Sequence, residues 1–110
     1  MLMLGVAYKK NVDDCRESPA FPIMRQLEQL GAELCFHDPH VDRIPPLRDW
    51  PELTGRSSQD LTAELVGSVD AVLLVTDHDR VDYAMVLEQA RLVVDTRGVF
   101  RESNSKLIRA

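Results

Sequence analysis

The sequence lacks the long apolar run that a membrane-spanning segment requires. Its N-terminal apolar run, Met1–Ala7, is much shorter than the roughly 20 residues that cross a bilayer as a helix. No basic residues precede this run, as they would in a secretory signal peptide. Cysteine is also scarce: Cys15 and Cys35 form neither a C-x-x-C pair nor a disulfide framework. These absences predict a soluble protein of the reducing cytoplasm that has no membrane partner.

The sequence also contains fewer basic than acidic residues. The chain carries 13 lysines and arginines against 18 aspartates and glutamates, which gives a formal net charge of −5. This balance argues against non-specific binding to nucleic acid, although a local cationic site is compatible with it. With 110 residues, 45% of them hydrophobic and 28% charged, the chain has the size and composition of one globular domain.

What the sequence does contain is an alternation of apolar runs and amphipathic segments. Four runs predict buried parallel strands: Met1–Ala7, Glu33–His37, Asp70–Thr76 and Arg91–Asp95. Between them the spacing predicts helices over 18–30, 60–66 and 82–90, a proline-rich irregular excursion over 39–58, and a helical or frayed tail over 103–110. This order predicts an α/β, Rossmann-like three-layer domain with a four-stranded or slightly larger parallel sheet. We expect the strand order 2-1-3-4, with helix 18–30 and helix 82–90 on opposite faces.

Polar clusters follow all four predicted strands: Tyr8-Lys9-Lys10, His37-Asp38, Thr76-Asp77-His78-Asp79 and Asp95-Thr96-Arg97. In open α/β sheets the carboxyl ends of parallel strands meet at one edge, where ligands bind. Lys9 and Arg97 directly follow strands, and Arg16 precedes the helix that Ser18 and Pro19 begin. Cations beside a helix start, where amides are free, suit a phosphate or diphosphate group.

Glycine is too sparse after the first strand to form a dinucleotide fingerprint. Gly5 is followed by Val6-Ala7-Tyr8 rather than by a second and third glycine, so we do not expect this chain to hold NAD alone. We expect no metal site either, because neither a strand nor a helix face supports the spacing of the residues around Asp38 and His78.

The acidic pair Asp13-Asp14 offers another interpretation, because receiver-type signalling domains carry two acids after their first strand. That fold also needs a phosphorylatable aspartate after the third strand and a lysine after the last one. Here the third strand ends in Thr76-Asp77 and the fourth is followed by Arg97.

Residues 5–19, Gly-Val-Ala-Tyr-Lys-Lys-Asn-Val-Asp-Asp-Cys-Arg-Glu-Ser-Pro, closely resemble the start of the C-terminal domain in the UDP-glucose/GDP-mannose dehydrogenase family. The resemblance spans residues 3–100 and includes Gly31-Ala32-Glu33, His37-Asp38-Pro39, Asp70-Ala71-Val72, Thr76-Asp77-His78 and Asp95-Thr96-Arg97. The segment 8–14 and the excursion at Ile44-Pro45-Pro46 are most similar to the branch that oxidises UDP-N-acetylglucosamine or a related UDP-N-acetylhexosamine.

The resemblance implies an NAD-dependent UDP-sugar 6-dehydrogenase. Such enzymes oxidise the sugar C6 hydroxyl to a carboxylate for polysaccharide precursor synthesis, and the expected substrate here is UDP-N-acetylglucosamine or UDP-glucose. They are homodimers with an N-terminal NAD domain, a central helical segment and a C-terminal domain that closes over the UDP-sugar. By position, Tyr8 and Lys9 would line the substrate pocket, Arg97 would grip the substrate, and Arg16 would reach across the domain cleft towards NAD.

The family's catalytic cysteine lies in a Gly-rich motif of a preceding domain, and neither Cys15 nor Cys35 has that context. The chain also begins inside a strand. We therefore expect residues 1–110 to be a single C-terminal UDP-sugar-binding domain, a fragment of a larger dehydrogenase, with no catalytic residue and no activity alone. A free-standing ligand-binding or regulatory α/β module is the alternative.

Overall fold

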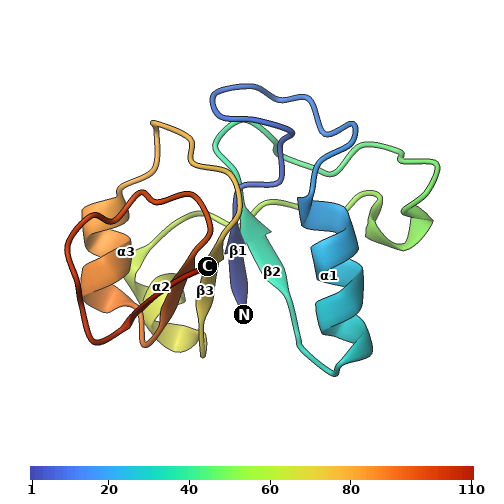
Figure 1. The fold of residues 1–110 in the computed structure, drawn as a ribbon. Helices are drawn as coiled ribbons and strands as arrows, with labels where there is room; N and C mark the ends of the chain where they lie inside the picture. The colour runs from blue at the N-terminus through green and yellow to red at the C-terminus, as the bar shows by residue number, and fades with distance from the viewer.

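The computed structural model describes all 110 residues and contains one sheet of five parallel strands in the order β2-β1-β3-β4-β5 (Figure 1). The strands are β1 Leu2–Leu4, β2 Cys35–His37, β3 Val72–Leu74, β4 Val93–Asp95 and β5 Leu107–Arg109. The helices are α1 Ala20–Gln29, α2 Ala63–Ser68 and α3 Tyr83–Gln89, with a 3₁₀ turn, η1, at Pro51–Leu53. The predicted fold class and the predicted order of the first four strands are confirmed.

Helices cover both faces of the sheet. Figure 1 shows α1 on one side and α2 and α3 on the other. Because side chains alternate along a strand, Met3 of β1 packs under α1 while Leu2 and Leu4 pack under α2 and α3. All three are essentially inaccessible to solvent, as the continuous apolar run predicts for a strand of a sheet that is covered by helices on both faces.

Local signals in the sequence set the ends of the helices. Thr62 and Asp82 cap α2 and α3, since their side-chain oxygens accept the amides of Leu65 and Met85 at 3.0 and 3.1 Å. Gly31, with φ of 96°, ends α1 in a Schellman turn in which Ala32 N donates to Leu27 O. The cap at Thr62 also explains why α2 begins at Ala63 rather than at residue 60, as the spacing had predicted.

The tail is the one element whose type the sequence predicted wrongly. Residues 103–110 form no helix, and Leu107–Arg109 instead pair with β4 as a fifth parallel strand. Leu107 packs against the core under α3, whereas Ile108 is half-exposed. The strand therefore forms because β4 offers an open edge, and this is a tertiary effect that the tail's own composition does not reveal.

The excursion over 39–58 lies against α1, as Figure 1 shows. Arg25 of α1 holds it: the guanidinium stacks 4.1 Å from the ring centre of Trp50, donates to Asp49 O and pairs with Glu52. The contact of Trp50 with Arg25 thus holds the excursion against the body of the domain. None of the helices combines the length and apolar character needed to span a lipid bilayer.

Candidate functional site

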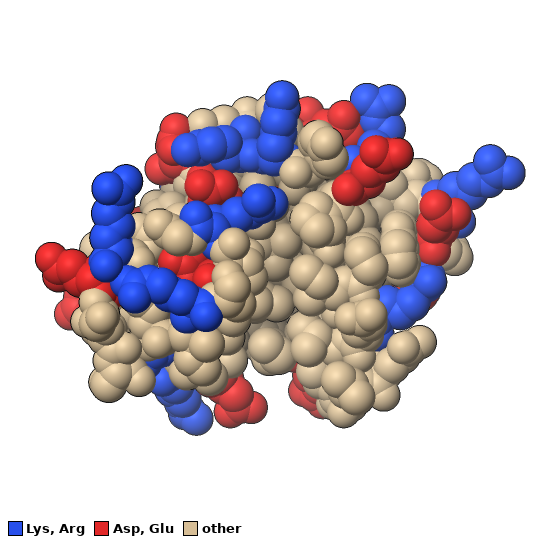
Figure 2. Space-filling model, viewed as in Figure 1, with Lys and Arg blue, Asp and Glu red and all other residues tan.

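Three of the predicted site residues lie around one cavity at the carboxyl edge of the sheet. Tyr8, Lys9 and Arg97 line a cavity of about 530 Å³ together with Lys10, Pro19 and Asp77. Tyr8 and Lys9 follow β1, Asp77 follows β3 and Arg97 follows β4, so the parallel topology gathers them. In Figure 2 lysine and arginine side chains project from the upper edge of the molecule, where the loop after β1 lies in Figure 1, with acidic side chains among them.

Arg97 is held with part of its guanidinium left free. Its Nε donates to Val75 O at 2.7 Å, and no other side-chain hydrogen bond or ion pair to Arg97 forms. The turn beneath it is built on the buried Asp95, whose Oδ1 accepts the amides of Arg97 and Gly98, both at 2.9 Å. The two terminal nitrogens therefore remain available for a ligand, and a guanidinium suits a phosphate or a carboxylate.

Lys9 is the second free cation of the cavity. It is exposed and makes no hydrogen bond or ion pair within the chain, whereas its neighbour Lys10 pairs with Asp79 at 3.4 Å. The loop that carries it closes on itself, since Tyr8 N donates to Asp14 O at 2.7 Å. Tyr8 also lines the cavity and is 49% exposed, so part of its ring is accessible to a ligand.

Arg16, the predicted cofactor contact, does not line this cavity. Its guanidinium binds Asp14 in a bidentate pair, with Nε 3.1 Å from Oδ1 and Nη2 2.9 Å from Oδ2. The hydrogen bond from the Arg16 side chain lowers the pKa of Asp14 to about 2. Arg16 lines neighbouring hollows with Tyr8 and Glu17, so it adds no third cation beside Lys9 and Arg97.

The start of α1 contributes less than the sequence predicted. Ser18 Oγ accepts the amide of Ala20 at 3.2 Å, and Pro19 and Pro22 have no amide hydrogen to donate. Few free amides therefore remain for an anion at this helix end. The positive potential of the cavity comes mainly from side chains.

A buried polar cluster beneath the cavity was not predicted as a unit. Asp38 and His78 are both fully or almost fully buried, and their side chains lie 2.9 Å apart between Oδ2 and Nε2. Asp38 also accepts the amides of Val6, Ala7 and His40 at 2.8, 3.2 and 2.8 Å. Sequence reasoning placed these two residues in polar clusters at the same edge of the sheet and considered them as metal ligands, but it did not predict that they pair with each other.

No group of three or more histidine, cysteine or acidic side chains is placed to hold a metal ion. The lone pairs of Asp38 are directed to protein donors. The cluster of Asp38 and His78 is therefore a structural hydrogen-bond network.

The turn after β1 does not fit the pyrophosphate of a dinucleotide. Gly5 has φ of 86°, and a Cβ placed on it would lie 2.5 Å from Thr76 O. Glycine is thus required at position 5 because Thr76 approaches its backbone so closely. Thr76 fills the space that a fingerprint glycine would leave for phosphate. The turn after β1 therefore lacks the geometry by which a fingerprint turn holds the pyrophosphate of NAD.

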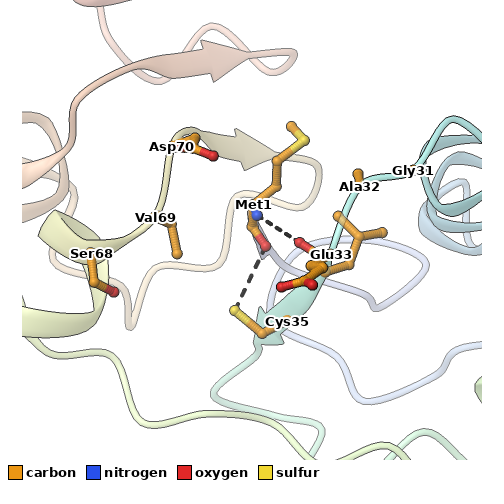
Figure 3. Close-up of a pocket in the computed structure, with 9 residues that line it drawn as sticks. Met1, Gly31, Ala32, Glu33, Cys35, Ser68, Val69 and Asp70 are labelled. Carbon is orange, nitrogen blue, oxygen red and sulfur yellow. Dashed lines mark hydrogen bonds between the residues drawn. The ribbon is translucent and has the colours of Figure 1, made fainter.

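A second cavity, of about 590 Å³, lies at the opposite, amino edge of the sheet (Figure 3). Its lining includes Met1, Glu33, Cys35 and Asp70. The N-terminal ammonium donates to Glu33 O at 2.7 Å, and the Cys35 thiol lies 3.7 Å from Met1 O. Although it is slightly larger, this cavity offers an anion no lysine or arginine, so the carboxyl edge is the better candidate site.

Comparison with protein families gives one match that covers nearly the whole chain. Residues 2–102 match the model of the UDP-glucose/GDP-mannose dehydrogenase family, UDP binding domain. Among curated proteins, the NDP-N-acetyl-D-galactosaminuronic acid dehydrogenase of Ralstonia solanacearum is 36% identical over 102 residues. That match covers 87% of this chain and 22% of the relative. The UDP-N-acetyl-D-mannosamine dehydrogenase of Escherichia coli is 31% identical over 101 residues, which is 88% of this chain and 22% of that protein.

Solved structures agree with the sequence relatives. A UDP-D-ManNAc dehydrogenase from Pyrococcus horikoshii matches with a TM-score of 0.70 and 25% identity, over 98% of this chain and 24% of that one. A GDP-mannose dehydrogenase from Pseudomonas aeruginosa has the same fold, with a TM-score of 0.73 at 23% identity, over 98% of this chain and 27% of that one. The chain therefore spans about a quarter or less of the length of the proteins it matches.

These matches decide between the interpretations that the sequence left open. A receiver-type signalling domain is excluded by the family match. The relatives are named for N-acetylgalactosaminuronic acid and N-acetylmannosamine, rather than for the N-acetylglucosamine or glucose expected from the sequence. These names agree with a related N-acetylhexosamine, which the predicted branch also allowed, but they do not support N-acetylglucosamine or glucose, whereas the family itself is shown.

Proposed function

The chain belongs to the UDP-glucose/GDP-mannose dehydrogenase family, whose UDP-binding domain it matches, and from this premise we propose that the cavity at the carboxyl edge binds the UDP part of a nucleotide sugar. One observation carries the proposal. Lys9 and Arg97, which follow different strands, line the same cavity with charged donors that have no partner in the chain. A diphosphate would supply the missing acceptors, and the ring of Tyr8 offers the sugar or the base a surface to pack on.

The rest of the protein's function follows as part of the same proposal. Residues 1–110 would act as one UDP-sugar-binding domain beside an NAD domain and a central helical segment in a dimeric cytoplasmic enzyme. That enzyme would oxidise the C6 hydroxyl of the sugar to a carboxylate, with NAD as the oxidant, for polysaccharide precursor synthesis. The names of the relatives favour a UDP-N-acetylhexosamine as the substrate. Arg16 would contact NAD across the cleft, after giving up part of its pairing with Asp14.

Substitution of the two free cations tests the site. In the full-length dehydrogenase, Lys9→Ala or Arg97→Ala should lower kcat/KM for the UDP-sugar roughly 10- to 150-fold, since a charge-assisted hydrogen bond contributes on the order of 1.5–3 kcal/mol. The melting temperature should change little, because both side chains are exposed.

Arg91→Ala is the matched control. Arg91 is an exposed arginine at the amino end of β4, and its only ion pair, with Asp70, spans 3.8 Å. This variant should keep wild-type kcat/KM. If Lys9→Ala and Arg97→Ala behave like the control, the site is assigned wrongly. If they lose activity only in proportion to folded protein, their role is structural.

A further inference from the structure

The loop that carries Tyr8 and Lys9 is held at both ends by polar contacts. At its start, Ala7 N donates to Asp38 Oδ2 at 3.2 Å, and Ala7 O accepts the Thr76 hydroxyl at 2.8 Å. At its far end, Asn11 N donates to His78 Nδ1 at 2.8 Å. Lys9 therefore lies between two fixed points, both of which depend on the segment that follows β3.

The backbone conformation and the side-chain hydrogen bonds of Asn11 favour this attachment. Its φ of 63° lies in the left-handed region, which asparagine tolerates better than most residues. Its side chain binds Asp79 twice: Nδ2 donates to Asp79 Oδ2 at 2.7 Å, and Oδ1 accepts the Asp79 amide at 2.9 Å. The Asn11 amide is thereby turned towards the buried ring of His78.

The two ring nitrogens of His78 have different, assigned roles. Nδ1 accepts the amide hydrogen of Asn11, so it carries no hydrogen itself. The single ring hydrogen must then be on Nε2, where it is donated to Asp38 at 2.9 Å. The ring is completely buried. A neutral imidazole is the side chain that joins a carboxylate on one side to an amide on the other.

We propose that His78 is a positioning residue, whose neutral ring fastens the 8–11 loop so that Tyr8 and Lys9 face the cavity. Asp38 fixes the tautomer of the ring, and the ring fixes Asn11. The consequence for UDP-sugar rests on the function proposed above. The attachment itself is a property of the chain and can be tested without any ligand.

A pair of substitutions separates the two sides of the ring. In His78→Asn the amide oxygen can take the place of Nδ1 and accept the Asn11 amide, while the donor to Asp38 is lost. In His78→Gln the longer side chain can place an NH₂ group near the position of Nε2, while the acceptor for Asn11 is lost. Both variants replace a buried ring by an amide, so their general effects on packing are comparable.

Amide hydrogen exchange measured by NMR on the 110-residue chain is the direct test. We expect the Asn11 amide to exchange up to roughly tenfold faster in His78→Gln than in His78→Asn, the range of one neutral hydrogen bond. The amide of Val72, which bonds to Leu92 O within the sheet, is the internal control and should not distinguish the two variants. Equal exchange of Asn11 in both variants would overturn the proposal.

A second measurement uses the wild-type protein and tests the assigned roles of the two ring nitrogens, even if both variants fail to fold. Long-range ¹H–¹⁵N correlation spectra at about pH 7 should show His78 with hydrogen on Nε2 alone, since an imidazolium would carry hydrogen on both nitrogens. A hydrogen on Nδ1 contradicts the assignment.

Kinetics of the full-length enzyme connect the attachment to function. His78→Gln should raise KM for the UDP-sugar more than it lowers kcat, and His78→Asn should restore KM towards the wild-type value. If Lys9→Ala has no effect on kcat/KM but the exchange result holds, only the function proposed for the cavity fails. If Lys9→Ala weakens substrate use but Asn11 exchanges alike in both variants, only the role of His78 fails.

Discussion

Asp38 is the residue on which most of the site's polar contacts converge. Burial acts to raise the pKa of its carboxyl group, but hydrogen bonds from His78, Val6 and His40 outweigh burial and hold the pKa below its ordinary value of 3.8. A carboxyl whose pKa is lower in the folded than in the unfolded chain stabilises the fold above its unfolded pKa. This contribution is lost as the pH falls through the folded pKa, which lies below 3.8.

Asp38→Asn should therefore destabilise the domain most at neutral pH. At about pH 7 we expect a loss of roughly 2 kcal/mol or more in the free energy of unfolding, because charge-assisted hydrogen bonds are removed and an NH₂ group faces donors. The gap to wild type should narrow as the pH falls below 3.8 and through the lowered folded pKa, where the carboxyl protonates in the folded chain as well. Urea denaturation of both proteins at several pH values measures this difference in the free energy of unfolding.

Asp42→Asn is the control for this experiment, because Asp42 is exposed and its carboxylate makes no hydrogen bond. That variant should be nearly as stable as wild type throughout. A gap for Asp38→Asn that stays the same at every pH would show that the charge of Asp38 contributes nothing.

The residues of the cavity were predictable because their positions follow from topology. In a parallel sheet, side chains that directly follow strands share an edge, and this places Lys9 and Arg97 together from sequence alone. Arg16 does not join these two cations as a third, because it pairs with Asp14, two residues away, and a local ion pair leaves no long-range signal. Its contact with NAD stays a prediction. The pairing of Asp38 with His78 was missed although both residues also follow strands, because a shared edge does not indicate which buried side chains make contact across β1.

At the scale of elements, β1 and β3 approach each other closely where β1 ends. Gly5 faces Thr76 there, and a Cβ on Gly5 would come within 2.8 Å of three atoms of that residue, two of them backbone. The positive φ of Gly5 adds a conformational penalty for any other residue. Sequence reasoning placed Gly5 in a strand but did not identify this contact.

Gly5→Ala and Gly31→Ala form a matched pair of variants. Both glycines have positive φ, 86° and 96°, but a Cβ on Gly31 meets nothing within 4 Å. We expect Gly31→Ala to cost about 1 kcal/mol in unfolding free energy from conformation alone, and Gly5→Ala to cost roughly 3 kcal/mol or more because overlap adds to it. Chemical denaturation of both variants checks the difference, and equal losses would mean that β1 and β3 can separate at no cost.

Elements with a pattern of their own were the ones that the sequence predicted. The four buried strands and the two main helices have clear periodicity, and the structure contains all of them. The fifth strand has none, since Leu107 is half-buried and Ile108 and Arg109 are exposed. Its conformation comes from pairing with β4, which a reading of the segment alone does not include.

For the whole molecule, the composition of the cavity limits what the domain can do alone. Burial raises the pKa of the Cys15 thiol to about 11, with Asp38 and Asp14 contributing, so this thiol is a poor nucleophile. Cys35 lines the cavity at the opposite edge, and burial raises its pKa as well. Because the turn after β1 lacks dinucleotide geometry and the pKa values of both thiols are raised, we do not expect this domain alone to supply an oxidant and a nucleophile beside a bound sugar.

We therefore expect the purified 110-residue chain to produce no NADH from any UDP-sugar. The measurement is the absorbance of NADH over several hours at high protein concentration. The Escherichia coli UDP-N-acetyl-D-mannosamine dehydrogenase, assayed in parallel with UDP-N-acetylmannosamine, is the positive control. Turnover by the chain alone would contradict the assignment of this domain to binding only.

The wide separation of the cavity residues along the chain has a consequence for folding. Lys9 and Arg97 are 88 positions apart, and β3 must lie between β1 and β4 before the two side chains can face one cavity. Closing so long a loop costs chain entropy that only the completed core offsets, so contacts of this kind form late. We therefore expect the cavity to form late in folding, and a nascent chain to lack it until the segment that carries Arg97 has been synthesised. A ligand that binds at this edge would therefore lower the unfolding rate of the finished domain and leave its folding rate unchanged.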